Sequence, residues 1–173
     1  LCSAILSDTL MFRSPTCTPL DRAAAEELAQ IAGLDIREYA TEMFRSSSRL
    51  RDRSMDELFH MDFKYFQVQN KKIAISQLTS VSENELNGIR DKMLGYMEDY
   101  LKTSGLSMQF VMLTNIIEEK TELLYVGRGA KNLVHTAFRK ECGEHSVVLP
   151  GVVSRKKQMV TPLLSAMEEE GTM

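Results

Sequence analysis

The segment from Met108 to Ile117 limits most strongly what this chain can fold into. Most of its residues are apolar, and turn signals bound it on both sides, with Gly105 before it and the polar run 118–121 after it. An apolar run of this length without regular polar alternation is typical of a strand that is buried on both faces. We therefore expect it to be an interior strand of a sheet that helices cover.

The pattern around this strand predicts an α/β (α+β) fold. Four further stretches have the composition or alternation of strands: 62–69, 72–81, 123–126 and 146–149. Helices are expected at 55–60, 83–103 and 131–140, and in a last segment that ends at about residue 168. Capping boxes at Ser54-x-x-Glu57 and Ser82-x-x-Glu85 begin the first two. Strands that follow one another directly predict a mixed sheet, of about five strands flanked by helices.

A helical segment precedes the sheet region. Thr18 and Pro19 begin a helix that closes at Gly33, and a second helix is expected to about Phe44. The polar run 46–53 then breaks the helical pattern, and it is the best candidate for a flexible connector between domains.

Composition excludes several classes of protein. A chain of 173 residues with 43% apolar residues can bury the core of one domain, or of one domain and part of another. A formal net charge of −3 argues against a general nucleic-acid binder. No apolar run reaches the roughly 18 residues of a membrane span, and no signal peptide is recognisable. Three scattered cysteines (Cys2, Cys17 and Cys142) predict reduced thiols and a cytoplasmic location.

A run of three cations lies in an unusual place, between two apolar segments. Arg155, Lys156 and Lys157 follow the strand-like run 147–149 and precede the apolar segment 159–164. Arginine presents a fork for two oxygens of a phosphate, and lysine presents a mobile point charge. A helix that starts here would add free backbone N–H groups. A phosphate-binding turn is one interpretation, and a solvated surface turn is the other.

Asp8 is the one charge in the apolar segment from Leu1 to Leu10. A buried carboxylate needs a partner, which is either a capping N–H group or a metal ion. Because the chain starts in the middle of this apolar segment, we expect it to be cut from a longer protein.

Three stretches together resemble the C-terminal half of a family II inorganic pyrophosphatase, of the DHH phosphoesterase superfamily. They are Ser-Asp-Thr-Leu with Phe-Arg-Ser-Pro-Thr-Cys-Thr at 7–18, Asp-Phe-Lys-Tyr-Phe at 62–66, and Val-Ser-Arg-Lys-Lys-Gln at 153–158. The resemblance implies that residues 1–47 are the C-terminal helical part of the DHH metal-binding domain. Residues 48–54 would be a flexible linker, and residues 55–173 the domain that clamps the substrate.

The resemblance also implies roles for single residues. Asp8 matches the last metal-binding aspartate of the family, and Lys64, Arg155 and Lys156 match the residues that contact phosphate. The other metal ligands of the family, including its Asp-His-His motif, do not occur in this sequence. The histidines of the chain lie elsewhere and are interpreted as surface or packing residues: His60, His135 and His145.

For the complete enzyme, the resemblance implies hydrolysis of pyrophosphate to two phosphates by a hydroxide that Mn²⁺ or Co²⁺ activates, with Mg²⁺ accompanying the substrate. The cationic clamp would neutralise the substrate from the opposite wall. Without a ligand, like charges about 4 Å apart repel by about 4 kcal/mol at an effective dielectric constant of about 20, so we expect splayed side chains. The implied partners are pyrophosphate, phosphate, the N-terminal DHH domain and a second copy in a homodimer.

Two other functions remain open at this stage. One is a phosphodiesterase or an exopolyphosphatase of the same superfamily. The other is an anion-binding regulatory domain without chemistry of its own, because one matched metal ligand cannot hold two divalent ions. For the same reason, we expect the chain by itself to hold no metal and to hydrolyse pyrophosphate negligibly.

Overall fold

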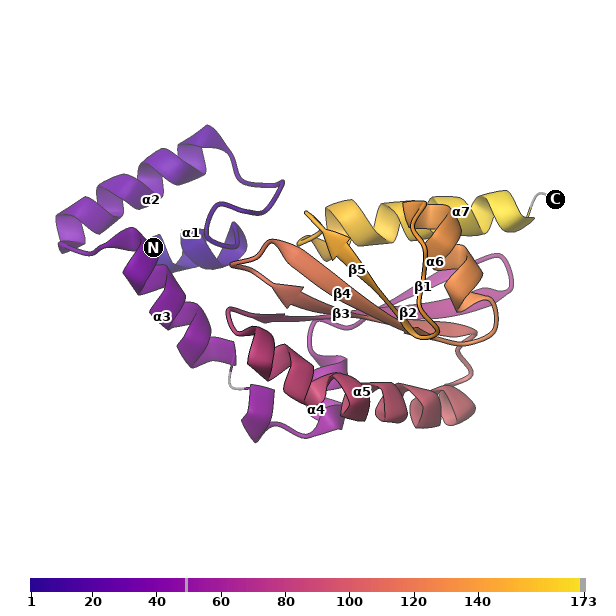
Figure 1. Cartoon of the computed structure of the whole chain (residues 1–173). Helices are drawn as coiled ribbons and strands as arrows, with labels where there is room; N and C mark the ends of the chain where they lie inside the picture. The colour runs from indigo at the N-terminus through magenta and orange to yellow at the C-terminus, as the bar shows by residue number, and fades with distance from the viewer. Residues whose placement is uncertain (49, 172–173) are drawn as a thin grey trace.

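A five-stranded mixed sheet, with its strands side by side in chain order, forms the centre of the molecule (Figure 1). The computed structural model describes residues 1–48 and 50–171. The strands are β1 (Lys64–Val68), β2 (Lys71–Ser80), β3 (Met108–Asn115), β4 (Lys120–Val126) and β5 (Ser146–Pro150). Only β2 and β3 pair in parallel, and the other neighbours are antiparallel. The expected mixed sheet is confirmed.

Helices cover both faces of the sheet. In chain order they are α1 (Cys2–Asp8), α2 (Pro19–Ala32), α3 (Ile36–Ser48), the 3₁₀ turn η1 (Leu50–Asp52), α4 (Met55–His60), α5 (Glu83–Ser104), α6 (Ala130–Phe138), the π-helix η2 (Arg155–Val160) and α7 (Thr161–Gly171). Helices α4 and α5 pack on one face, and α6, η2 and α7 pack on the other (Figure 1).

Strand β3 is the centre of the core. All of its residues are buried, and its two neighbours in the sheet are β2 and β4. Phe110 and Met112 point into the layer of α6 and α7, whereas Val111 and Leu113 point into the layer of α4 and α5. Since both faces of this strand are covered, apolar residues occur in both of its side-chain sets. The prediction of an interior strand is confirmed.

Two of the three helix starts that the sequence predicted have the expected hydrogen bonds. At Thr18 and at Ser54, the N-cap side chain and the residue three positions later hydrogen-bond each other's backbone N–H. Ser82 also accepts from the N–H of Glu85, but the Glu85 carboxylate does not return to Ser82. It accepts instead from the N–H of Leu50 at 2.9 Å and from the hydroxyl of Ser80 at 2.5 Å. A long-range contact therefore replaces half of the capping box.

Helix α3, which was expected to end at about Phe44, is longer than expected. It continues to Ser48 instead of ending at about Phe44, because Phe44 is buried in a cluster with Val81 and Ile116 at the ends of β2 and β3. After it, Leu50 is fully buried against α5. The linker over 48–54 stays a prediction, and its residue 49 lies outside the described residues.

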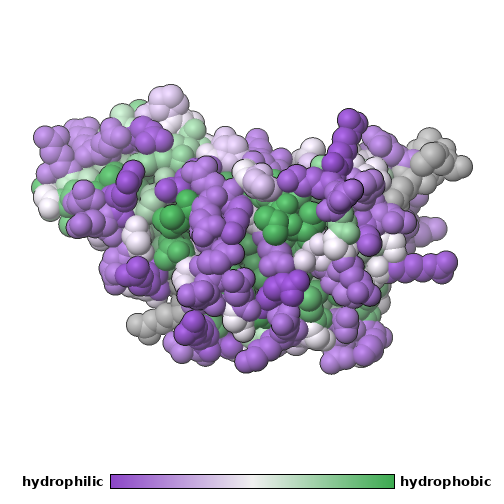
Figure 2. All heavy atoms as spheres, viewed as in Figure 1, coloured by the Kyte–Doolittle hydropathy of each residue, from purple (hydrophilic) through white to green (hydrophobic). Residues whose placement is uncertain are grey.

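The surface is mostly polar, with an exception in the N-terminal helices. On the face drawn in Figure 2, hydrophilic side chains cover most of the surface and apolar ones show between them in small groups. Among the described residues, several large apolar side chains are exposed in the first part of the chain: Leu1, Leu20, Ile31 and Leu34. None of the helices in the described residues is long and apolar enough to cross a membrane.

Candidate anion-binding site

A pocket of about 490 Å³ opens between β1 and the π-helix η2. Its walls combine cations with apolar and small polar side chains: Lys64, Phe66, Arg155, Lys156, Lys157, Val160 and Thr161. The structure thus brings the predicted residues Lys64, Arg155 and Lys156 to one pocket, although β2, β3, β4 and β5 lie between them in the chain.

The register of the sheet explains how Lys64 reaches this pocket. Strand β1 pairs with β2 so that Lys64 lies opposite Ile75 and Phe66 opposite Ile73. Side chains alternate along a strand, so Lys64 and Phe66 share the face on which η2 and α7 pack. Tyr65 points to the other face, where its hydroxyl lies 3.5 Å from that of Tyr100 on α5.

The basic run itself is helical, although the sequence predicted a turn. Residues 155–160 form a π-helix with Ser154 as its N-cap. The Gln158 side chain organises the entry to this helix. Its Oε1 accepts from the backbone N–H groups of Val153 and Ser154, both at 3.0 Å, and its Nε2 donates to the carbonyl of Gly151 at 2.7 Å.

A second glutamine, Gln77, binds the next backbone N–H group, that of Arg155. The N–H of Arg155 donates to Oε1 of Gln77 at 3.3 Å, and Nε2 of Gln77 donates to the carbonyl of Val153 at 2.9 Å. The N–H of Lys157 donates to the Ser154 hydroxyl. The expectation that these N–H groups would be free for an anion is therefore wrong for Arg155 and Lys157, because side chains satisfy them. An anion in this pocket would meet the charged side chains.

Arg155 is paired with a carboxylate that the sequence analysis did not assign to the site. Its Nε lies 3.1 Å from Oδ2 of Asp62, and its Nη2 lies 2.6 Å from Oδ1. The Arg155 side chain is 13% exposed and that of Asp62 is 51% exposed. The expectation of splayed cations without a ligand stays a prediction. For Arg155, this two-point ion pair holds the guanidinium.

Comparison with known proteins gives the family. Residues 41–166 match the family model described as DHHA2 domain. The chain belongs to the DHHA2 domain family. The resemblance that the three sequence stretches suggested is confirmed, because the similar proteins are inorganic pyrophosphatases.

Two similar curated proteins come from clostridia. A probable manganese-dependent inorganic pyrophosphatase of Clostridium acetobutylicum is 39% identical over 97% of this chain and 54% of its own length. A cobalt-dependent inorganic pyrophosphatase of Clostridium perfringens is 39% identical over 94% of this chain and 30% of its own length. The crystal structure of a Methanococcus jannaschii protein assigned to family II inorganic pyrophosphatases superposes with a TM-score of 0.84 at 37% identity, over 96% of this chain and 54% of the other. The chain therefore spans about half the length of two of these proteins and less than a third of the other.

Asp8 differs from what the sequence analysis expected. It is the last residue of α1, and it is exposed rather than buried. Within residues 1–48 and 50–171, no group of three or more His, Cys, Asp or Glu side chains could hold a metal ion. The described residues of this DHHA2 chain thus do not form a metal centre by themselves, and Asp8 can offer at most one ligand. Its predicted metal role stays a prediction.

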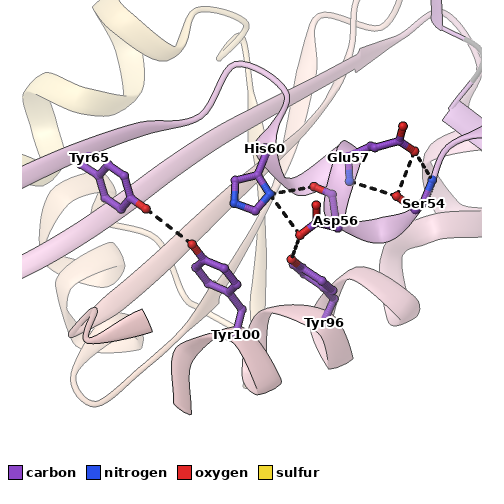
Figure 3. Close-up of polar contacts among 7 residues, drawn as sticks. All are labelled: Ser54, Asp56, Glu57, His60, Tyr65, Tyr96 and Tyr100. Atoms are coloured by element: carbon purple, nitrogen blue, oxygen red, sulfur yellow. Dashed lines mark hydrogen bonds and ion pairs between the residues drawn. The ribbon is translucent and has the colours of Figure 1, made fainter. Parts of the chain in front are cut away.

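His60 precedes the stretch 62–66, which includes Lys64. It belongs to a packing cluster on the face of β1 opposite to the pocket (Figure 3). Its Nδ1 lies 2.8 Å from the carbonyl oxygen of Asp56, whose carboxylate accepts from the Tyr96 hydroxyl at 2.5 Å. Burial, and then the bond to Asp56, raises the pKa of Tyr96. The bond to Tyr65, and then burial, raises the pKa of Tyr100 to about 12. Both tyrosines stay protonated at neutral pH. Their rings join α4 to α5, and the Tyr100 hydroxyl joins α5 to Tyr65 on β1.

The hydrogen bonds of Gln158 lead to a testable prediction. Replacing Gln158 by methionine keeps the length of the side chain but leaves the N–H groups of Val153 and Ser154 without their acceptor. We expect the free energy of unfolding to fall by about 1–3 kcal/mol, the range for a buried donor that loses its partner. Urea denaturation measures this change.

The control for this variant is Gln67→Met, because Gln67 on β1 is exposed and its side chain bonds, among the described residues, only the nearby carbonyl of Gln69. We expect this control to change the unfolding free energy by less than about 0.5 kcal/mol. Equal effects of the two substitutions would contradict the role of Gln158 as the organiser of the basic helix.

Proposed function

We propose that this chain is the substrate-clamping part of an inorganic pyrophosphatase, in which Lys64, Arg155 and Lys156 bind the phosphate groups of pyrophosphate. The observation that supports this most directly is that these three cations, far apart in the sequence, line one pocket. With Lys157 the pocket has four cations, and among the described residues one carboxylate, that of Asp62, pairs with Arg155. The remaining positive charge suits a ligand with several negative charges.

The residues of the pocket would act by positioning and by charge. The cations would hold both phosphate groups in place and stabilise the charge that moves to the leaving phosphate. The apolar side chains of Phe66 and Val160 would limit the access of water to one wall. Electrostatic interactions are stronger where water is excluded, so these apolar neighbours would strengthen the clamp.

The relatives named above are manganese-dependent and cobalt-dependent, and the described residues form no metal centre. We assign Mn²⁺ or Co²⁺ to a complete protein in which the region that this chain does not span supplies most ligands and Asp8 supplies one. In such a protein the metals would provide an activated hydroxide, and Mg²⁺ would accompany the pyrophosphate.

A further domain would cover the exposed apolar side chains of the N-terminal helices in the complete protein. Leu20 and Ile31 on α2 are each 77% exposed, an unusual state for large apolar residues on a surface. We propose that the DHH domain covers them, with residues 1–47 as its last helices and 48–54 as the linker. We also propose a homodimer of the complete protein and, because Cys2, Cys17 and Cys142 are unpaired, a cytoplasmic location.

The test compares this chain with the complete protein that includes the DHH region. We expect the chain alone to bind pyrophosphate in isothermal titration calorimetry and to release no phosphate above background with Mn²⁺ or Co²⁺. The complete protein is expected to release phosphate from pyrophosphate at an ordinary enzymatic rate, above about 1 s⁻¹.

Two further substrates separate the alternatives. Tripolyphosphate tests the exopolyphosphatase interpretation, and bis-p-nitrophenyl phosphate tests the phosphodiesterase interpretation. Faster hydrolysis of either one than of pyrophosphate would contradict the proposed function. If the complete protein binds pyrophosphate but hydrolyses none of the three, the anion-binding regulatory domain is the better description.

A further inference from the structure

The ion pair between Asp62 and Arg155 uses only one edge of the arginine. A guanidinium group has five N–H donors. Asp62 accepts from Nε and from Nη2, at 3.1 and 2.6 Å. No described residue accepts from Nη1 or takes the second proton on Nη2, so these protons remain for another acceptor. Arg155 can therefore keep its bond to Asp62 and bind a phosphate oxygen pair at the same time.

Asp62 reaches Arg155 from outside the pocket. Arg155 is part of the pocket wall, whereas Asp62 is not. The Asp62 side chain is half exposed, and that of Arg155 is largely covered. Since Asp62 is not part of the pocket wall and binds the edge formed by Nε and Nη2, a ligand does not have to displace the carboxylate in order to reach the other edge of the guanidinium.

The backbone holds both residues in this arrangement. Asp62 has a φ of +45°, a left-handed conformation that is uncommon for residues other than glycine and that aspartate and asparagine adopt more readily than most. It lies between the end of α4 and Lys64 at the start of β1. At the other side, the N–H of Arg155 is bonded to Gln77. Arg155 is therefore fixed at its backbone by Gln77 and at its guanidinium by Asp62.

We propose that Asp62 is a positioning residue, which orients Arg155 so that a phosphate group meets a fork that is already in place. This inference rests on the proposed function and deepens it. Charge and positioning make opposite predictions here. Since a carboxylate near the site repels an anion, charge alone predicts that its removal tightens binding. A flexible arginine that must be ordered at each binding event binds more weakly, so positioning predicts the reverse.

The experiment measures pyrophosphate binding to the chain by isothermal titration calorimetry for Asp62→Asn. Asparagine is nearly isosteric and tolerates the left-handed backbone, so the turn is retained. We expect the Kd to rise about 5- to 10-fold, the factor for loss of order in one long side chain. The control is Asp91→Asn, which removes the same charge from another aspartate–arginine pair, on α5 with a side chain that is 88% exposed, and which should leave the Kd unchanged.

A double-mutant cycle shows whether Asp62 acts through Arg155. In an Arg155→Ala background, Asp62→Asn should no longer weaken binding. Equal or tighter binding by the single variant Asp62→Asn would overturn the proposal, and so would a loss of the same size in both backgrounds.

A second measurement does not depend on the ligand. In side-chain ¹⁵N spectra, the Nε–H of Arg155 should exchange with water at least about 10-fold more slowly than that of the exposed Arg128, and Asp62→Asn should remove the difference. Exchange as fast as that of Arg128 in the unmodified chain would overturn the positioning role. If the unmodified chain and the complete protein both fail to bind pyrophosphate, the proposed function is overturned instead, and the exchange rate decides on Asp62 alone.

Discussion

In the complete protein, replacing Arg155 by alanine is expected to lower the turnover of pyrophosphate by about 100-fold or more, the usual effect of removing one donor from a site that stabilises developing negative charge. Alanine removes the charge, the fork and the partner of Asp62 together. Arg155→Lys should cost less, about 10-fold, because lysine keeps the charge and loses the planar fork that can bond Asp62 and a phosphate at once. Initial rates of phosphate release at saturating and limiting pyrophosphate measure both effects.

The matched control for these two variants is Arg128→Ala. Arg128 is a cation too, although an exposed one, and it follows β4 at its C-terminal end, whereas the pocket lies near the end of β5, which pairs with the start of β4. We expect its turnover to change by less than about 2-fold. If Arg155→Ala kept the activity of the Arg128 control, the clamp would be wrong and the basic run would be a structural helix only.

The largest expected effect on stability is that of Gly127→Ala. Gly127 follows β4 with a φ of +112°, and an added Cβ would lie 2.4 Å from the carbonyl oxygen of Ser107 and 2.8 Å from Cα of Met108. Both are backbone atoms at the start of the central strand, so neither can rotate away. Left-handed backbone strain of about 1–2 kcal/mol and overpacking of about 1–3 kcal/mol together predict a loss of about 2–5 kcal/mol.

Gly129 is the control for this substitution, because it also has a positive φ, +86°, but an added Cβ would meet no atom within 4 Å. Gly129→Ala should therefore cost only the backbone strain, about 1–2 kcal/mol. Urea denaturation of both variants, followed by circular dichroism at equal protein concentration, separates the two contributions. Equal midpoints for the two variants would show that the close approach of Gly127 to β3 is not important for stability.

Local chemistry determined much of the secondary structure. Thr18 and Ser54 cap their helices as predicted, because the acceptor and the N–H group that it satisfies are three residues apart and need no other part of the molecule. Gly33 and Gly105 end their helices in left-handed conformations that glycine adopts without steric cost. The apolar run of β3 predicted that this strand lies in the interior of the sheet, since a strand that is buried on both faces has no polar alternation.

The cations of the candidate site could be predicted from the sequence, but the groups that hold them could not. The sequence stretches around Lys64, Arg155 and Lys156 identified three residues that the structure places on one pocket. A signal for the supporting residues was present but weak: Gln77 is a polar residue in the interior of β2, next to Leu78, and Asp62 stands two positions before Lys64.

Tertiary structure alone decided which partners these polar groups found. Asp62 and Arg155 are 93 positions apart, and Gln77 and Arg155 are 78 apart, so no local pattern specifies either contact. Similarly, Glu85 had a local partner in Ser82, and yet it bonds Leu50 and Ser80, because burial of Leu50 brings an unsatisfied N–H group to its carboxylate. A local bond forms wherever its few residues adopt one conformation. A long-range bond forms only where packing of the core has already brought both groups together, and that information lies in the whole fold.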